Sequence, residues 1–215
     1  MSIHDKIKDL LNNVEKPVIF EIGCRLCEDT KILAQIPNSK VYCFEGDPDV
    51  IKQLLDQEKE WLKTNHNKVF LNTFAIGEKT GFVEWYSADN GHSSSLREPK
   101  DHLKHFGHVK FEKKRLVTVV SLDLVFRKLW KQNHIDFLWI DVQGAESDVF
   151  NGGQDALKHT KYIYFECYDV EMYAGQLMLP DLLKLLPFNY KLIEKWPTEV
   201  LVENLDYDKN QSDTI

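Results

Sequence analysis

The sequence predicts an α/β protein whose mostly parallel sheet is covered by helices on both faces. Two observations predict this fold class. Short apolar runs alternate with amphipathic helical segments through most of the chain, which is typical of a parallel sheet with crossover helices. The last two strand-like runs instead follow each other directly, which favours a closing antiparallel pair. The 215 residues fit one domain, expected to span residues 1–205.

The strands are predicted from apolar, β-branched and aromatic runs that turn-forming residues bound. Runs that are apolar almost throughout are typical of strands buried on both faces. In chain order the predicted strands are VIFEI (18–22), KVYCFE (40–45), KVFLNTFAI (68–76), GFVEWYS (81–87), RLVTVVSL (115–122), IDFLWIDV (135–142), KYIYFECY (161–168), YKLIEKW (190–196) and TEVLVEN (198–204).

Helical spacing of apolar residues and capping signals predict the helices. The first lies within residues 1–16. Glu28 and Asp29 suit a first helical turn, where negative charge meets the positive end of the helix dipole. Asp47 caps the next helix and Pro48 begins it. The remaining predicted helices are SLDLVFRKLWKQN (121–133), a short stretch after Gly144 and LPDLLKLLP (179–187).

Two segments have no predicted helix or strand. Residues 88–114 are long and polar, and such a segment in a compact domain is often a lid or binding loop. Residues 206–215 form a polar tail that is expected to be disordered.

Composition excludes several function classes. The net charge of −7 and the absence of a basic stripe argue against nucleic-acid binding. No apolar run approaches the ~18 residues of a membrane-spanning helix, so no membrane insertion is expected. The N-terminus lacks the features of a signal peptide, and four cysteines then suggest free thiols in the cytoplasm.

Acidic residues gather where the predicted strands end. Glu21, Glu45, Asp141 and Glu166 lie at four of five carboxyl ends, and Ala75–Ile76 lie at the fifth. Ligands of such sheets bind at this edge. Glu45 follows a glycine-containing first turn at the spacing of an acid that accepts hydrogen bonds from both ribose hydroxyls, although it also suits a helix cap.

The sequence resembles the FkbM family of class I S-adenosylmethionine-dependent methyltransferases. The resemblance covers residues 17–168. It implies one Rossmann-like domain, a seven-stranded sheet with a reversed hairpin at one edge, and methyl transfer to oxygen, often in a sugar or natural product. FEGDP (44–48) and IDVQGAE (140–146) are its more specific motifs. The matching segments are VIFEIGCRLCEDT, VYCFEGDPDV, FAIGEKTG, GHSSSL, VVSLDLV and IDFLWIDVQGAESDVFNGG.

The resemblance also implies roles for single residues. The first loop would line the methionine part of the cofactor, Glu45 would hold the ribose, and Asp141 would lie near the transferred methyl group. One departure is Cys27, where the family usually has glycine; its Cβ crowds the backbone if a positive φ is needed. The residues expected to bind S-adenosylmethionine are Glu21, Gly23, Cys24, Arg25, Glu45, Gly46, Ala75, Ile76 and Asp141.

Catalysis requires a proton to leave the acceptor hydroxyl, so a base within hydrogen-bonding reach is expected. Asp141 is the first candidate, followed by His92 and Glu166. A divalent cation held by Asp141 and another carboxylate would acidify the hydroxyl instead.

The alternative function is a non-catalytic S-adenosylmethionine-binding or interaction protein. An NAD dehydrogenase is disfavoured because Arg25 and Glu28 occupy the second and third glycine positions of G-x-G-x-x-G.

The C-x-x-C of Cys24 and Cys27 has two further interpretations. A redox dithiol needs a thioredoxin-like context, which the motifs above do not supply. A zinc site needs two more ligands, and the nearest candidates, Cys43 and Cys167, lie inside predicted strands. The sequence therefore predicts neither a metal ion nor a redox pair at this motif.

Overall fold

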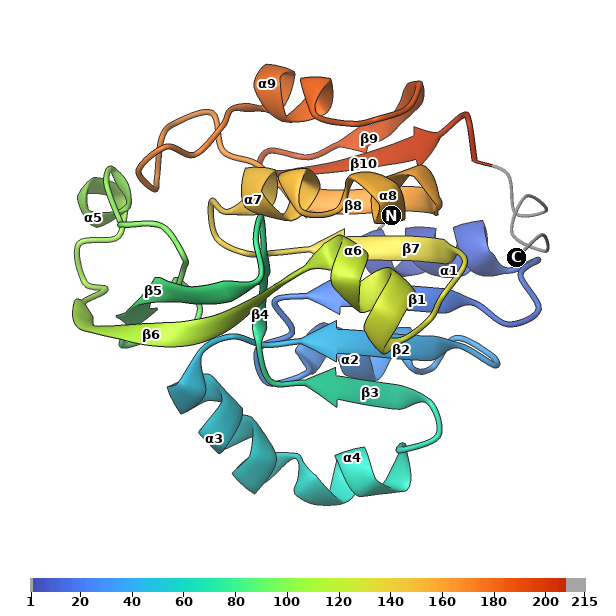
Figure 1. Cartoon of the computed structure of the whole chain (residues 1–215), viewed down its shortest axis with the longest axis horizontal. Helices are drawn as coiled ribbons and strands as arrows, with labels where there is room; N and C mark the ends of the chain where they lie inside the picture. The colour runs from blue at the N-terminus through green and yellow to red at the C-terminus, as the bar shows by residue number, and fades with distance from the viewer. Residues whose placement is uncertain (1, 208–215) are drawn as a thin grey trace.

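The computed structural model describes residues 2–207 and contains a seven-stranded sheet in the order β3-β2-β1-β7-β8-β10-β9 (Figure 1). Most of the predicted tail, residues 208–215, lies outside the described residues. The strands of this sheet are β1 Val18–Ile22, β2 Lys40–Phe44, β3 Val69–Asn72, β7 Ile135–Ile140, β8 Thr160–Glu166, β9 Tyr190–Lys195 and β10 Glu199–Asn204.

The strand directions confirm the predicted fold class. β1 lies parallel to β2 and β7, β2 to β3, and β7 to β8. β10 runs antiparallel to both β8 and β9, which makes the C-terminal reversed hairpin. Strand order reverses between β1 and β7, so the carboxyl ends of these two strands mark the expected ligand-binding edge.

Helices cover both faces of the sheet. Side chains alternate along β1, so Phe20 packs in one core and Ile19 in the other. The first core is completed by α6 to α9 and the second by α1 to α4. The helices are α1 Ile3–Leu11, α2 Glu28–Leu33, α3 Pro48–Gln57, α4 Lys59–Thr64, α5 His102–His105, α6 Leu122–Leu124, the π-helical turn η1 Val125–Leu129, α7 Glu146–Asn151, α8 Gln154–Lys158 and α9 Leu179–Lys184.

A second, three-stranded sheet lies beside the binding edge. It contains β4 Ala75–Gly77, β5 Gly81–Ala88 and β6 Phe111–Ser121 in the order β4-β6-β5. The predicted strand 68–76 is therefore two strands, because β4 leaves the main sheet and pairs with β6. The predicted strand 115–122 is found within β6, which begins earlier, and the predicted helix 121–133 is found in shorter form as α6 and the π-helical turn η1, ending at Leu129.

The segment 88–114 is more regular than the sequence indicated. It contains the end of β5, the single turn α5 and the first residues of β6. Figure 1 shows β5, β6 and α5 together on one side of the molecule, next to the carboxyl ends of β1 and β2. Within residues 2–207, every helix is too short or too polar to cross a bilayer.

Candidate active site

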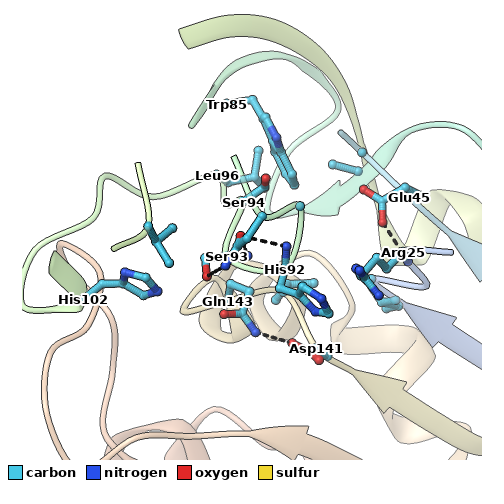
Figure 2. A pocket seen from close by; sticks show the side chains of 18 of the residues that line it. Arg25, Glu45, Trp85, His92, Ser93, Ser94, Leu96, His102, Asp141 and Gln143 are labelled. Atoms are coloured by element: carbon cyan, nitrogen blue, oxygen red, sulfur yellow. Dashed lines mark hydrogen bonds between the residues drawn. The ribbon is translucent and has the colours of Figure 1, made fainter. Parts of the chain in front are cut away.

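A cavity of about 450 Å³ opens at the carboxyl ends of β1, β2 and β7. Its size lies within the range of small-molecule sites. One part of its wall comes from these strand ends and from β4 and β5, and another comes from the segment 90–109 (Figure 2). Of the predicted site residues, the cavity is lined by Gly23, Arg25, Glu45, Gly46, Ala75, Ile76, His92 and Asp141.

Glycine is required where the first loop leaves β1. Gly23 has a φ of +91°, and a Cβ at this position would lie 1.8 Å from the carbonyl oxygen of Asp141. The backbone of the loop at Gly23 therefore packs directly against the backbone at the end of β7, with no side chain between them. Gly46 is similarly constrained, because a Cβ there would lie 2.6 Å from the Cβ of Ala75. These two contacts bring the ends of β1, β2, β4 and β7 around one space.

Glu45 presents a buried carboxylate at the end of β2. Its Oε2 accepts a hydrogen bond from the backbone N–H of Arg25 at 2.9 Å, and its Oε1 accepts one from the N–H of Asp47 at 2.7 Å. Burial raises the pKa of this carboxyl to about 7. Each carboxylate oxygen accepts more than one hydrogen bond, so both can still bind ligand hydroxyls. The helix cap of α3 is Asp47, which accepts a hydrogen bond from the N–H of Asp49, so Glu45 is not needed as a cap.

Two residues expected in the cofactor site lie outside the cavity lining. Glu21 is 1% exposed and accepts a hydrogen bond from Thr30 Oγ1 at 2.5 Å; burial holds the pKa of its carboxyl well above the usual range. Cys24 is buried in the core below the loop. Both side chains therefore lie beneath the loop, not in the cavity lining where they were expected.

The thiols of the first loop form a buried cluster. Among residues 2–207, Cys24, Cys27 and Cys43 are the group whose metal-binding atoms converge, with their sulfur atoms within 4.8 Å of one another. Cys43 joins this cluster although it lies in β2, so its place in a strand did not exclude it. The cluster packs within an apolar core, where thiols serve as small apolar side chains.

Cys27 adopts the conformation that glycine would favour. Its φ is +63°, at the residue that caps α2. A left-handed conformation costs a residue with a Cβ roughly 1–2 kcal/mol. The side chain is fully buried and points into the thiol cluster, away from the cavity lining. Any effect of this thiol on a cofactor is therefore transmitted through the loop backbone.

Asp141 and Glu166 are joined through one amide. Gln143 Nε2 donates to Asp141 Oδ1 at 2.6 Å and to Glu166 Oε2 at 2.8 Å. Glu166 also accepts a hydrogen bond from Tyr168 at 2.6 Å and does not contribute to the cavity lining. Burial raises the pKa of both carboxyls. Asp141 therefore faces the cavity, whereas Glu166 lies outside the cavity lining and contacts Asp141 through Gln143.

His92 approaches the same space from the segment 90–109. Figure 2 shows its ring between Arg25 and Asp141. Burial and the positive charge of Arg25 lower the pKa of the imidazole. At neutral pH the ring is therefore uncharged and able to accept a proton.

The other residues of the segment 90–109 that line the cavity were not predicted. They include Ser93, Ser94, Leu96, His102, Phe106, His108 and Val109. Two signals pointed to them: the prediction of a binding loop in 88–114 and, for Ser93, Ser94 and Leu96, the matching family segment GHSSSL. Arg97 fixes this wall: it forms a bidentate ion pair with Asp148 and donates to Ser147 Oγ and the Ala174 carbonyl.

The residues present suit S-adenosylmethionine. A buried carboxylate with free acceptor capacity, Glu45, can receive two ribose hydroxyls. Ala75, Ile76 and Trp85 supply apolar and aromatic surface nearby for the adenine, and Arg25 supplies a cation for the carboxylate of the methionine part. The lining of the cavity continues past Asp141 to Gln143 and His102.

Comparisons with known proteins agree with this geometry. The model of the methyltransferase FkbM domain matches residues 31–198. The curated 2-O-methyltransferase NoeI of Sinorhizobium fredii is 32% identical over 208 residues, covering 93% of this chain and 82% of that protein.

Two solved structures share the fold. A protein assigned as an rRNA methylase from Clostridium thermocellum superposes with a TM-score of 0.53 at 11% identity, covering 96% of this chain and 95% of that one. TrmK of M. capricolum, solved with S-adenosyl-homocysteine, superposes with a TM-score of 0.50 at 11% identity, covering 98% and 71%.

Proposed function

This chain belongs to the FkbM methyltransferase family, and we propose that the hydroxyl it methylates is part of a carbohydrate. It is an S-adenosylmethionine-dependent O-methyltransferase, which sets aside the alternative of a non-catalytic binding protein.

The observation that carries the proposal is the difference between the two ends of the cavity. Glu45 and Arg25 bring charge to one end, whereas the other end combines hydroxyls, an amide and imidazole rings with apolar and aromatic surface, without lysine or arginine in its lining. A sugar has the same mixture of hydroxyls and apolar ring faces. A phosphorylated or polyanionic acceptor would need cations that this end lacks among residues 2–207.

Asp141 is proposed as the base. Bound S-adenosylmethionine would supply an activated methyl group on its sulfonium. The Asp141 carboxylate accepts the proton of the acceptor hydroxyl, and Gln143 fixes its orientation through Oδ1. Its raised pKa makes it a stronger base than an exposed aspartate. Gln143 lies between Asp141 and Glu166 and donates a hydrogen bond to each, so the two carboxylates are bridged by an amide, which favours a base over a cation ligand.

An acceptor screen tests the substrate class. The wild type is incubated with S-adenosylmethionine and a panel of methyl glycosides, phenols and aliphatic alcohols, and methylated products are detected by mass. We expect a glycoside to be methylated on one hydroxyl. Methylation confined to phenols or aliphatic alcohols contradicts the carbohydrate proposal but leaves the O-methyltransferase activity intact.

Asp141→Asn tests the base. The amide keeps the shape of the side chain but accepts no proton, so we expect kcat to fall about 10²-fold or more with S-adenosyl-homocysteine affinity retained. The exposed Asp181→Asn is the matched control.

A chelator tests the alternative role of Asp141. EDTA should leave the wild type active; a loss of activity that magnesium restores would make Asp141 a cation ligand instead. Wild-type kcat in Asp141→Asn would refute the assignment and make His92 the next candidate.

A further inference from the structure

His102 is a buried polar side chain in the cavity wall whose hydrogen-bonding capacity is unused. It is 3% exposed and contributes to the lining of the cavity. Neither ring nitrogen has a hydrogen bond among residues 2–207: Nδ1 is fully enclosed without a partner, whereas Nε2 is not fully enclosed and is the nitrogen that a ligand can reach. Leaving a buried polar group unpaired costs about 1–3 kcal/mol, so a wall that retains one is suited to a ligand that pairs with it.

Packing holds the His102 ring in place. Ring centroids of Phe106, Phe111 and Tyr173 lie 5.0, 5.4 and 5.4 Å from its own. Burial lowers the pKa of the imidazole, so at neutral pH one nitrogen donates and the other accepts. A hydroxyl, which also donates and accepts, matches this ring.

Phe106 places an aromatic surface beside it. It lines the same cavity and is 39% exposed, so part of its ring is accessible. An exposed aromatic ring at a cavity mouth offers a flat apolar surface to an apolar ring face. Together the two residues present one stacking surface and one hydroxyl-pairing group.

The position of this pair separates it from the cofactor end. Figure 2 shows His102 on the opposite side of the cavity from Arg25 and Glu45, with His92, Gln143 and Asp141 between them. A molecule that contacts Glu45 and reaches Asp141 therefore leaves the His102 end to the second substrate.

We infer that His102 and Phe106 form the acceptor subsite: a pyranose ring stacks on Phe106 while one of its hydroxyls, other than the one that is methylated, exchanges a hydrogen bond with the His102 imidazole. The inference rests on the proposed carbohydrate acceptor and adds the residues that select it. A sugar that lacks this second hydroxyl is then a poorer substrate, because the buried imidazole stays unpaired.

The test compares His102→Phe, His102→Gln and the exposed His105→Phe, with the methyl glycoside that the wild type methylates best. Phenylalanine keeps the ring packing but cannot pair with a hydroxyl, so the KM for the glycoside should rise about tenfold or more. Glutamine restores part of the loss because its amide also donates and accepts. His105→Phe should match the wild type, and S-adenosyl-homocysteine should bind all four proteins within threefold.

Each outcome separates this inference from the proposed function. An unchanged glycoside KM in a folded His102→Phe variant overturns the inference and leaves the carbohydrate acceptor standing. Loss of S-adenosyl-homocysteine affinity also overturns it, because His102 would then serve the cofactor end. If His102→Phe does not fold, His102→Gln and a series of monodeoxy glycosides decide: equal KM values across the series overturn the inference. A wild type that methylates no glycoside contradicts both proposals.

Discussion

At the scale of single residues, burial decides how the acidic side chains of this site act. Glu45 and Glu21 lie near the same loop, and the sequence offered both as cofactor ligands. Glu21 is enclosed and paired with Thr30, whereas Glu45 is held by two backbone N–H groups and faces the cavity. Orientation toward the cavity, which no sequence pattern encodes, distinguishes a binding carboxylate from a supporting one.

Glu45→Gln tests this distinction. A carboxylate accepts ribose hydroxyls with charge-assisted hydrogen bonds worth about 1.5–3 kcal/mol each, and an amide loses that strength. We expect the Kd of S-adenosyl-homocysteine, measured by calorimetry, to rise about 10- to 100-fold. One of the two oxygens that accept backbone N–H groups becomes an NH2 group in glutamine, so the melting temperature of the free variant should fall, and the Kd is compared at a temperature at which both proteins are folded. The exposed Glu60→Gln is the control; equal affinity of both variants would remove Glu45 from the ribose site.

At the scale of elements, the sequence predicted where the strands lie better than it predicted which strands pair with each other. The alternation of apolar runs and helices predicted the parallel sheet, and the direct succession of the last two strands predicted the reversed hairpin. It did not predict that the chain leaves the main sheet after Asn72, because apolar residues resume directly after Asn72 and Thr73, with no glycine or proline to mark a break before Ile76. Pairing of β4 with β6 depends on residues more than forty positions apart, which local patterns do not report.

The same limit applies to the candidate site. Strand ends predicted Glu45 and Asp141, since parallel strands bring their carboxyl ends to one edge. His102 and Phe106 come from a segment whose position depends on side-chain contacts to α7 and to the chain before α9. Polar composition alone predicted a binding loop there without identifying which residues line it.

Arg97→Met tests how this wall is held. Arg97 joins the segment 90–109 to Asp148 with two hydrogen bonds of 3.1 and 2.8 Å, and the pair is largely shielded from solvent. Without it we expect kcat/KM for the acceptor to fall about tenfold or more, because misplaced groups lose catalytic efficiency steeply, while cofactor affinity changes less than threefold. Amide exchange in 90–109 should accelerate.

Arg127→Met is the matched control for Arg97→Met, since Arg127 also makes a bidentate pair, with Asp155, but contributes nothing to the cavity lining. Equal loss of kcat/KM in the two variants would mean that general stability, rather than the wall, limits activity.

At the scale of the whole molecule, the binding edge gathers buried acids that resist ionisation. Glu45 and Glu146 both have a pKa raised to about 7 by burial, and burial also raises the pKa of Glu21, Asp141 and Glu166. A carboxyl whose pKa is higher in the folded than in the unfolded state destabilises the fold as it ionises. The free energy of unfolding is therefore lowered by these groups as pH rises from about 4.5 to about 7. The buried acids at the ligand-binding edge thus make the folded protein less stable at neutral pH than it would be without them.

Glu146→Gln isolates this effect in one group. Glu146 is 1% exposed, and its Oε1 accepts a hydrogen bond from the N–H of Gly144, which a glutamine oxygen also can. At pH 5 both side chains are uncharged in the folded protein, so the variant and the wild type should melt at nearly the same temperature. At pH 8 the wild-type carboxyl must ionise while buried, and a shift from 4.5 to about 7 corresponds to about 3 kcal/mol.

The variant should therefore gain stability relative to the wild type as pH rises, reaching a melting temperature about 6–12 °C higher at pH 8. Comparing two proteins at each pH cancels the opposite contribution of His92 and His102, whose lowered pKa values destabilise the fold as pH falls. Differential scanning fluorimetry at pH 5, 6, 7 and 8 measures the difference directly. A difference that stays constant with pH, or that shrinks as pH rises, would mean that Glu146 ionises in the folded protein without penalty and that the acids of this edge do not govern its stability.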